Sequence, residues 1–309
     1  MKKPLFSLMQ LPVFCSFQDQ GRKKATIQGF SRSGAMDQWS YQVANRLCGG
    51  SNLVALEIAQ GGLKLSALTQ GQLALTGANA PLYINQKRQD NWCLLDFNQG
   101  DIIEIQQPHS GCWSYLCVPG GFVNQRFLQS GSCHMYEPQH QNNHLDINTT
   151  LFSTSQPKQI NQSLAYAYRP LCKQKLYVRF IPAYQWDSLA IDDQQKITQQ
   201  PFTVSSQSNR MGYRLTNKIS LKIKKPAYPL PIIAGSIQIP NPKEAIIMMR
   251  DHQTLGGYPQ IGTIIQQDLN DLAQLRAGGE LYLLPFQFNQ QQHKVSPPKL
   301  LHCKQIKNK

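Results

Sequence analysis

Three side chains suited to acid–base or hydrogen-bonding chemistry follow an apolar run late in the chain. The run Ala245–Met249 is typical of a buried strand, and Asp251, Thr254, Gly256–Gly257 and Tyr258 come soon after it. At a strand end, the Asp251 carboxylate can act as a general base or orient a water molecule, while Thr254 and Tyr258 can contact a substrate. Paired glycines let a ligand approach the backbone closely. A strand followed by a tight turn that Asp251 caps explains the same residues without a substrate.

Two other stretches of the second half carry similar groups. Arg210 opens the motif Arg210–Leu215, which includes Tyr213, and Gln238 lies between Ile237 and Ile239. The Arg210 guanidinium can hold a carboxylate or phosphate through two hydrogen bonds, or form a structural ion pair. The Gln238 amide can be presented to a substrate.

The first half has polar candidates near a predicted helix start. Ser33 belongs to Ser31–Asp37, where small residues leave backbone N–H groups free to bind an anion. Asp37 is equally suited to cap the helix that follows. Asn45 and Glu57 are polar residues in apolar surroundings. Each can satisfy buried backbone groups or touch a substrate.

Taken in order, these motifs resemble those of the KipA family, also called allophanate hydrolase subunit 2 or the biotin-dependent carboxyltransferase family. The resemblance extends from Phe17 to Pro285 and rests on Ser31–Asp37, Ala44–Leu47, Ala55–Ile58, Arg210–Leu215 and Asp251–Pro259. It implies a mainly β fold of two cyclophilin-like β-barrel modules with a few short helices. It also implies a site without metal, with Asp251 as the catalytic residue and substrate contacts from Ser33, Asp37, Asn45, Glu57, Arg210, Tyr213, Gln238, Thr254, Gly256, Gly257 and Tyr258.

Within the family, the chain is most like the C subunit of bacterial 5-oxoprolinase. The resemblance implies a complex that hydrolyses the lactam of 5-oxoproline to glutamate with ATP, together with a KipI-like (PxpB) subunit and a lactam-handling (PxpA) subunit. Two alternatives stay open. One is carboxyl transfer to a urea-like amide with biotin on another chain, because no Met-Lys-Met carrier sequence occurs here. The other is a non-catalytic KipA-like regulatory subunit that binds a KipI-like partner.

Three positions depart from the family pattern. Asn209 stands where the family usually has Asp, Pro229–Leu230 where a Ser-Glu pair is common, and Gly131 where an Arg is usual. Losing a charged group from a site costs orders of magnitude in rate when that group takes part in proton transfer. The departures therefore favour the alternative of a non-catalytic regulatory subunit.

Turn residues and short apolar runs set the predicted organisation. Their regular spacing favours antiparallel barrels or sandwiches. Two helices are expected, over Gln38–Leu47 with Asp37 as its cap and over Asp268–Leu275. The predicted domains are residues 1–172 for the first module with a long loop, 173–288 for the second module and 289–309 for a flexible tail.

The net charge of +14 raises the question of nucleic acid. The densest basic cluster, Lys218–Lys225, alternates with apolar residues as the solvent face of a strand does, and no nucleic-acid-binding signature is visible. A small anionic substrate or an acidic partner subunit suits this charge instead. His134, His140 and His144 match no standard metal-site spacing and predict a solvated loop.

The eight cysteines contain no CxxC pair, and several lie in apolar runs, which favours free thiols in a reducing compartment. No apolar stretch approaches the roughly 20 residues of a membrane span. We therefore expect a cytoplasmic protein without a membrane partner. No P-loop or dinucleotide fingerprint occurs, so any nucleotide is expected to be held in another way, with a partner subunit.

Overall fold

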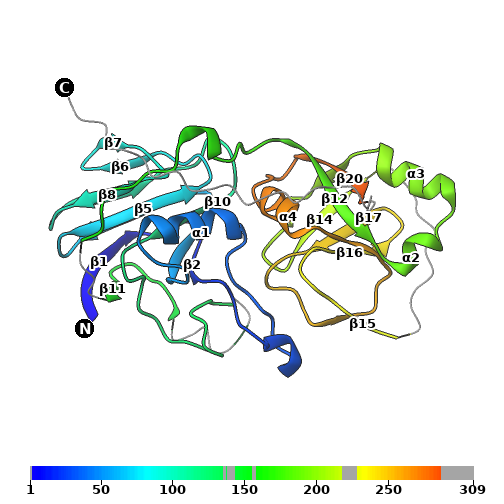
Figure 1. Cartoon of the computed structure of the whole chain (residues 1–309), viewed down its shortest axis with the longest axis horizontal. Helices are drawn as coiled ribbons and strands as arrows, with labels where there is room; N and C mark the ends of the chain where they lie inside the picture. The colour runs from blue at the N-terminus through cyan, green and yellow to red at the C-terminus, as the bar shows by residue number, and fades with distance from the viewer. Residues whose placement is uncertain (1, 135–136, 138–142, 155–157, 218–227, 287–309) are drawn as a thin grey trace.

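The computed structural model describes residues 2–286 apart from 135–136, 138–142, 155–157 and 218–227. Two β-rich modules lie side by side along the long axis, as Figure 1 shows, and strands dominate both of them. The predicted mainly β fold is confirmed. The basic stretch Lys218–Lys225 falls outside the described residues, as do His140 and the predicted tail over 289–309.

The first module is built from two sheets that share one core. The first has the strand order β11-β1-β4-β9-β6-β7, and the second has the order β2-β3-β10-β5-β8. The strands are β1 (Lys2–Gln10), β2 (Phe14–Gln18), β3 (Ala55–Ala59), β4 (Leu63–Ala67), β5 (Gly71–Gly77), β6 (Leu82–Ile84), β7 (Lys87–Gln89), β8 (Leu94–Phe97), β9 (Ile102–Ile105), β10 (Trp113–Cys117) and β11 (Thr150–Thr154).

Alternation of apolar and polar residues explains how these strands face the core. In β4, Leu63, Leu65 and Ala67 are buried, whereas Lys64 and Ser66 are partly exposed. A period of two places every second side chain on one face of the sheet, so this strand buries its apolar half.

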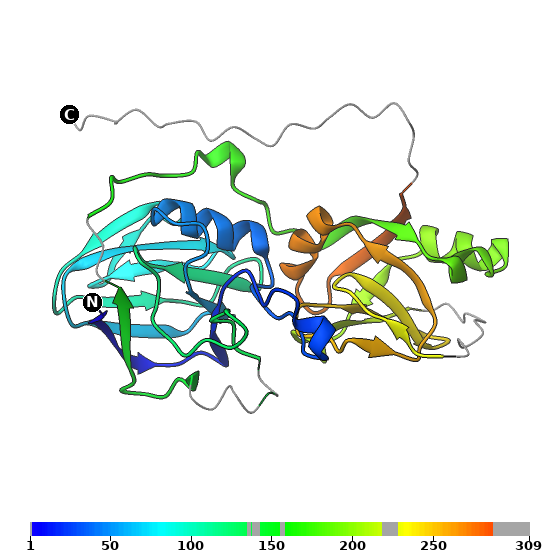
Figure 2. The same cartoon turned by 60° about the horizontal axis from the view of Figure 1, so that its bottom comes forward.

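Helix α1 (Gln38–Leu47) has the predicted bounds and packs against β5 and β10. The Ser40 backbone N–H donates to Asp37 Oδ1 at 3.0 Å, so Asp37 caps the helix as expected. Ahead of α1, a long loop carries the 3-10 helix η1 (Ala25–Gln28) towards the second module (Figure 2).

The second module is a closed barrel with the strand order β12-β19-β16-β17-β14-β13-β20. Its interior is filled by branched and aromatic side chains such as Phe180, Ile237, Ile247 and Leu283. The strands are β12 (Lys175–Pro182), β13 (Phe202–Val204), β14 (Gly212–Thr216), β16 (Ser236–Asn241), β17 (Glu244–Met248), β19 (Gln260–Ile264) and β20 (Glu280–Pro285).

A small two-stranded sheet and three helices complete the second module. Strands β15 (Leu230–Pro231) and β18 (Leu255–Gly256) form a separate two-stranded sheet, called here the β15–β18 flap. The helices are α2 (Tyr184–Asp187), α3 (Ile191–Gln199) and α4 (Gln266–Ala273). The second predicted helix therefore exists, two residues earlier than expected at each end.

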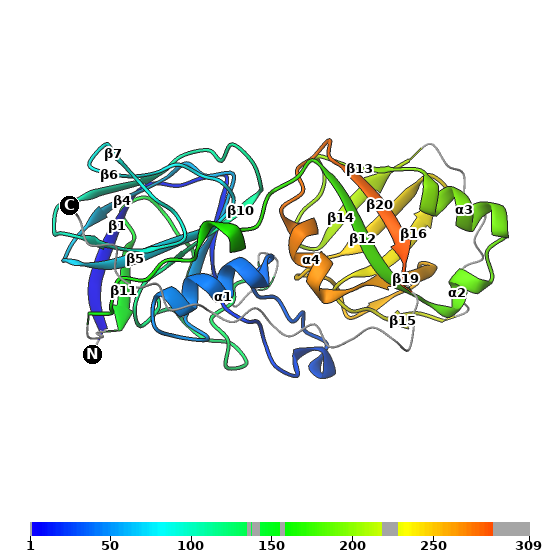
Figure 3. The same cartoon turned by 45° about the horizontal axis from the view of Figure 1, so that its top comes forward.

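The connection between the modules includes the 3-10 helix η3 (Tyr166–Tyr168), and α4 lies on the side of the barrel that faces the first module (Figure 3). The first group of strands ends at Thr154 and the second begins at Lys175. The exact domain boundaries stay predictions. None of the helices in the described ranges is long and apolar enough to cross a bilayer.

Candidate functional site

Arg210 and Asp251 meet where β14 begins and β17 ends. Their backbones are joined first, because the Asp251 N–H donates to the Arg210 carbonyl at 2.8 Å. The side chains then form a bidentate pair, with Arg210 Nε 2.8 Å from Asp251 Oδ2 and Nη2 2.8 Å from Oδ1. This is the planar geometry in which a guanidinium binds a carboxylate most strongly.

The first module supplies the other half of this cluster. Glu57 of β3 accepts a hydrogen bond from Arg210 Nη1, and Ser33 Oγ donates to Asp251 Oδ1 at 2.7 Å. Arg210 Nη2 also donates to the Gly34 carbonyl at 2.9 Å. We call Ser33, Glu57, Arg210 and Asp251 the junction cluster, because it joins the two modules through buried charges.

Burial makes this cluster expensive to disturb. Arg210, Asp251 and Glu57 are 6%, 2% and 0% exposed. Taking such ions out of water costs several kcal/mol each, and removing one partner leaves another charge buried without compensation. The cluster therefore fixes the relative position of the modules, whether or not it adds net stability.

The two carboxyl groups differ in acidity. Burial raises the pKa of Asp251, but the charge and hydrogen bonds of Arg210 outweigh burial and hold that pKa below its usual value. For Glu57, burial outweighs the same guanidinium and raises the pKa. Asp251 is thus the permanent partner of Arg210 and a weak proton acceptor, and Glu57 is the carboxyl that is easier to protonate.

A pocket of about 320 Å³ lies beside the junction cluster and is lined by both modules. Its walls are mostly nonpolar, and the charged residues that line it within the described part of the chain, Arg210 and Asp251, are already paired with each other. Tyr213 lines the same pocket, where its hydroxyl donates to the Ala273 carbonyl at 2.7 Å and accepts from Trp113 Nε1 at 3.1 Å. These bonds join α4 to β10 across the junction.

Asp37 and Asn45 have structural partners. Besides capping α1, Asp37 accepts from Gln274 Nε2 at 2.9 Å. Asn45 donates to the Tyr41 carbonyl at 3.1 Å and accepts from the Leu53 N–H. The backbone N–H groups at the start of α1 are also used. Met36 N donates to Glu57 Oε2 at 2.7 Å, and Asp37 N to the Tyr115 hydroxyl at 2.7 Å, so no anion is needed there.

The remaining predicted residues lie at the far end of the loop that begins at Asp251. Gln238 of β16 is 1% exposed, and a Cβ built on Gly256 would lie 2.6 Å from its Nε2. The Thr254 carbonyl accepts from Ile232 N at 2.9 Å, and Tyr258 is 42% exposed. A Cβ on Gly257 would meet nothing within 4 Å. The predicted site residues therefore form two groups, one at the junction and one at the flap.

The three departures from the family pattern have different structural consequences. Asn209 Oδ1 accepts from the Met211 N–H at 2.8 Å, a bond that Asp would also make. A Cβ on Gly131 would lie 2.5 Å from Val54 Cγ2, so a side chain such as Arg would require the neighbouring side chains to shift. Leu230 pairs with Gly256 in the flap.

Several residues that shape the junction escaped the sequence analysis. Gln274 accepts from the Cys112 and Trp113 N–H groups at 2.8 and 3.0 Å. Tyr115 donates to Glu57 Oε2 at 2.9 Å. Arg250 is buried beside Asp251, its Nη2 has no partner, and burial lowers its pKa to about 10. A polar residue inside an apolar strand or helix was the available signal for Gln274 and Tyr115.

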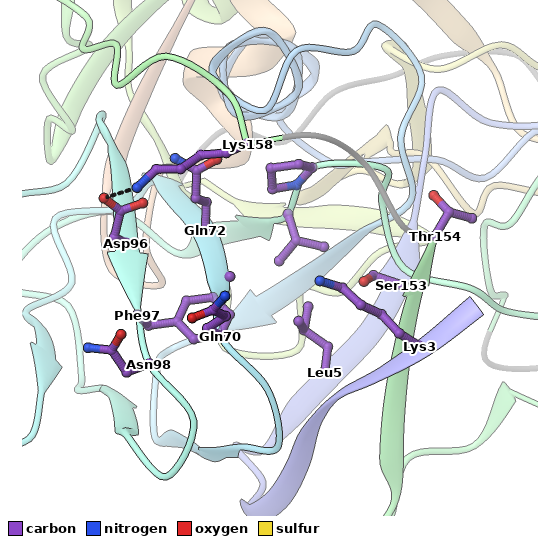
Figure 4. A pocket seen from close by; sticks show the side chains of 13 residues that line it. Lys3, Leu5, Gln70, Gln72, Asp96, Phe97, Asn98, Ser153, Thr154 and Lys158 are labelled. Atoms are coloured by element: carbon purple, nitrogen blue, oxygen red, sulfur yellow. Dashed lines mark hydrogen bonds and ion pairs between the residues drawn. The ribbon is translucent and has the colours of Figure 1, made fainter. Parts of the chain in front are cut away.

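A second pocket, of about 310 Å³, lies in the first module and contains none of the predicted site residues (Figure 4). Lys158 and Asp96 form an ion pair of 3.0 Å at its edge. No group of three or more His, Cys, Asp or Glu side chains in the described part of the chain could hold a metal ion.

Comparisons with known proteins agree with this architecture. The chain is 29% identical to the C subunit of 5-oxoprolinase from Haemophilus influenzae over 282 residues, which cover 90% of each chain. It is 28% identical to the C subunit of the Escherichia coli K12 5-oxoprolinase over 301 residues, 91% of each chain.

Among solved structures, the Kluyveromyces lactis urea carboxylase matches with a TM-score of 0.85 and 22% identity, over 93% of this chain and 28% of that one. At this identity the match shows the fold alone. A family model described as "Carboxyltransferase domain, subdomain A and B" matches residues 28–285. The chain therefore belongs to the carboxyltransferase domain family, subdomains A and B.

Proposed function

We propose that this chain is the C subunit of an ATP-dependent 5-oxoprolinase complex that opens the lactam of 5-oxoproline with water to give glutamate. The observation that carries the proposal is how much of each chain the similarity covers. The similarity to two proteins named as C subunits of 5-oxoprolinase covers 90% or more of both chains, whereas the chain spans 28% of the urea carboxylase that it resembles in fold.

The geometry suggests a division of labour between the two groups of site residues. The junction cluster holds the modules together and fixes Asp251, whose two carboxylate oxygens are occupied by Arg210 and Ser33. Asp251 is therefore suited to positioning its loop rather than to removing a proton. Gln238, Thr254 and Tyr258, at the other end of that loop, are the proposed substrate contacts.

ATP does not fit the junction pocket. Among the described residues that line it, the cation is Arg210, which Asp251 and Glu57 neutralise, so these residues offer no free positive charge to a triphosphate. We place the nucleotide with a KipI-like subunit, propose that the lactam site is shared between this chain and a lactam-handling subunit, and derive no step through ATP. Opening an unreactive amide needs orientation and charge stabilisation, which a site shared between subunits can supply.

The test is reconstitution with the KipI-like and lactam-handling subunits, followed by ATP hydrolysis with and without 5-oxoproline. We expect 5-oxoproline to stimulate hydrolysis. Asp251→Asn, which keeps the shape of the side chain, should reduce this stimulation, and Asp96→Asn, at an exposed ion pair in the first module, should not. Equal hydrolysis with and without 5-oxoproline in a stable complex would contradict the proposal and favour a regulatory subunit.

Carboxyl transfer is the second candidate, because the matching family model describes a carboxyltransferase domain. Biotin would then arrive on another chain. Transfer of labelled carboxylate from free carboxybiotin to urea by the purified chain would favour this candidate over lactam hydrolysis.

A further inference from the structure

Two glutamines face each other on β16 and β19, and one of them, Gln238, lies against Gly256 of the β15–β18 flap. Gln238 of β16 is the register partner of Gln260 of β19 in an antiparallel pair. Partners in such a ladder project from the same face of the sheet, about 5 Å apart at Cβ. Their neighbours Ile237 and Ile261 are fully buried in the core, so the two amides leave the barrel on its outer side.

Within the described ranges of the chain, each amide has one buried atom without a hydrogen-bond partner. These atoms are Nε2 of Gln238, a donor, and Oε1 of Gln260, an acceptor. The Gln260 backbone N–H is satisfied, since it donates to Gln185 Oε1 at 2.6 Å. A buried polar atom left without a partner costs about 1–3 kcal/mol, and native proteins keep few of them. An open donor and an open acceptor on adjacent strands can together bind a ligand that offers the complementary pair.

A cis amide offers that pair. Its carbonyl oxygen and its N–H lie on the same edge of the group, and a ring locks them there. We propose that Gln238 and Gln260 form a subsite for a cyclic amide, in which Gln238 Nε2 donates to the carbonyl oxygen and Gln260 Oε1 accepts from the ring N–H. The choice of a cyclic amide rests on the proposed function, whereas the donor–acceptor pair does not.

The flap explains how such a group reaches a covered site. Only two residue pairs join β15 to β18, and further bonds run from Ile232 N to the Thr254 carbonyl at 2.9 Å and from Ile233 N to Ser236 Oγ at 3.2 Å. Leu255, on the flap, is 58% exposed. A segment with so few buried contacts opens at low cost. Gly256 lets the flap close on Gln238, because a Cβ there would lie 2.6 Å from Gln238 Nε2 and 2.4 Å from Ile232 Cδ1.

The experiment is a methyl NMR titration of the full chain, labelled at isoleucine δ1 so that Ile232 reports on the flap. The probes are 2-pyrrolidinone and N-methyl-2-pyrrolidinone, which lacks the N–H. We expect the Ile232 signal to shift with 2-pyrrolidinone and the N-methyl compound to bind at least about tenfold more weakly, as the loss of one hydrogen bond predicts. Gln260→Met should weaken the binding of 2-pyrrolidinone to a similar degree. Gln199→Met, at the exposed end of α3, should leave this binding unchanged.

Thermal unfolding separates a ligand role from a structural one. Because Gln260 Oε1 has no partner among the residues that the structure describes, Gln260→Met should unfold within about 3 °C of wild type. A clearly larger fall would mean that a bound water or protein group already satisfies this atom, and would overturn the proposal. Equal affinity for the two lactams, or no shift with either, would overturn it too. The chain is tested alone and without ATP, so this result is independent of whether the complex hydrolyses 5-oxoproline.

Discussion

The loop from Asp251 to Tyr258 ends in two regions with opposite properties. At the junction, Ser33, Glu57, Arg210 and Asp251 are buried and each has a hydrogen-bonding partner of the other module. At the flap, Gln238 and Gln260 are left with one unpaired buried atom each. The four members of the junction cluster form a satisfied polar network, which fixes a structure, whereas the open donor and acceptor at the flap can bind a ligand. The junction is thus the anchor and the flap is the region that responds.

Breaking the anchor should have the largest effect. We expect Arg210→Met to destabilise the chain by about 3–5 kcal/mol, because two carboxylates are left buried without a counter-charge. Arg214→Met is the control, since the Arg214 side chain is 45% exposed and its pair with Glu244 should contribute about 0–1 kcal/mol. Urea unfolding followed by tryptophan fluorescence measures both. Similar losses for the two variants would show that the junction is no anchor.

The two carboxyl groups of the anchor should respond oppositely to neutralisation. Asp251 has a folded pKa below its ordinary 3.8, so its contribution to stability is present above pH 3.8 and lost as the pH falls through the folded value. Asp251→Asn should therefore destabilise at neutral pH and approach wild type in acid. Stability curves of the variant and wild type from pH 3 to pH 7 measure this.

For Glu57 the sign is reversed. Its folded pKa lies above its ordinary 4.5, so its favourable contribution is present below pH 4.5 and is lost as the pH rises through the folded value. Glu57→Gln should match wild type in acid and become the more stable of the two towards neutral pH. A Glu57→Gln variant that becomes less stable than wild type as the pH rises would refute the assignment of Glu57 as the carboxyl group whose pKa is raised on folding.

The local stability of the flap should fall when Gly256 is replaced by alanine and should hardly change when the neighbouring Gly257 is replaced. Gly256→Ala forces a Cβ against the ends of the Ile232 and Gln238 side chains, which must shift, so it should cost about 1 kcal/mol of local stability. Gly257→Ala meets open space and should change stability by less than about 0.5 kcal/mol. Amide hydrogen exchange at Ile232, whose N–H bonds to Thr254, is the measurement. Equal exchange rates in the two variants would argue against a flap closed on Gln238.

The smallest effect is expected at Asn209. Its Oδ1 accepts from the Met211 N–H, and an Asp would accept the same bond. Asn209→Asp should therefore change the free energy of unfolding by less than about 0.5 kcal/mol. A thermal melt measures this, and a large change would show that the missing charge matters to the turn itself.

Local patterns predicted helix α1 and its Asp37 cap with the correct bounds, because a cap and a helical period are properties of a short segment. The motifs also identified Arg210 and Asp251. They could not show that these residues neutralise each other across 41 positions and meet Glu57 across 153, since such pairing depends on the docking of two modules.

The sequence analysis was limited at Gly131 and at Gln260 for other physical reasons. The sequence suggested that Gly131 marks a lost arginine, but a side chain there would require the neighbouring Val54 and Asn124 side chains to shift. Gln260 gave no signal at all, because a single glutamine in a glutamine-rich chain resembles any other. Only its register opposite Gln238 and its unpaired Oε1 make it distinctive.

The most direct test of the division between anchor and flap is a crystal structure of the chain soaked with 2-pyrrolidinone. We predict the ring beneath the β15–β18 flap, with its oxygen about 3 Å from Gln238 Nε2 and its nitrogen about 3 Å from Gln260 Oε1. The junction cluster should remain unchanged. A ring bound instead in the pocket beside Arg210 and Asp251, with the flap empty, would contradict the assignment of the anchor and the ligand site.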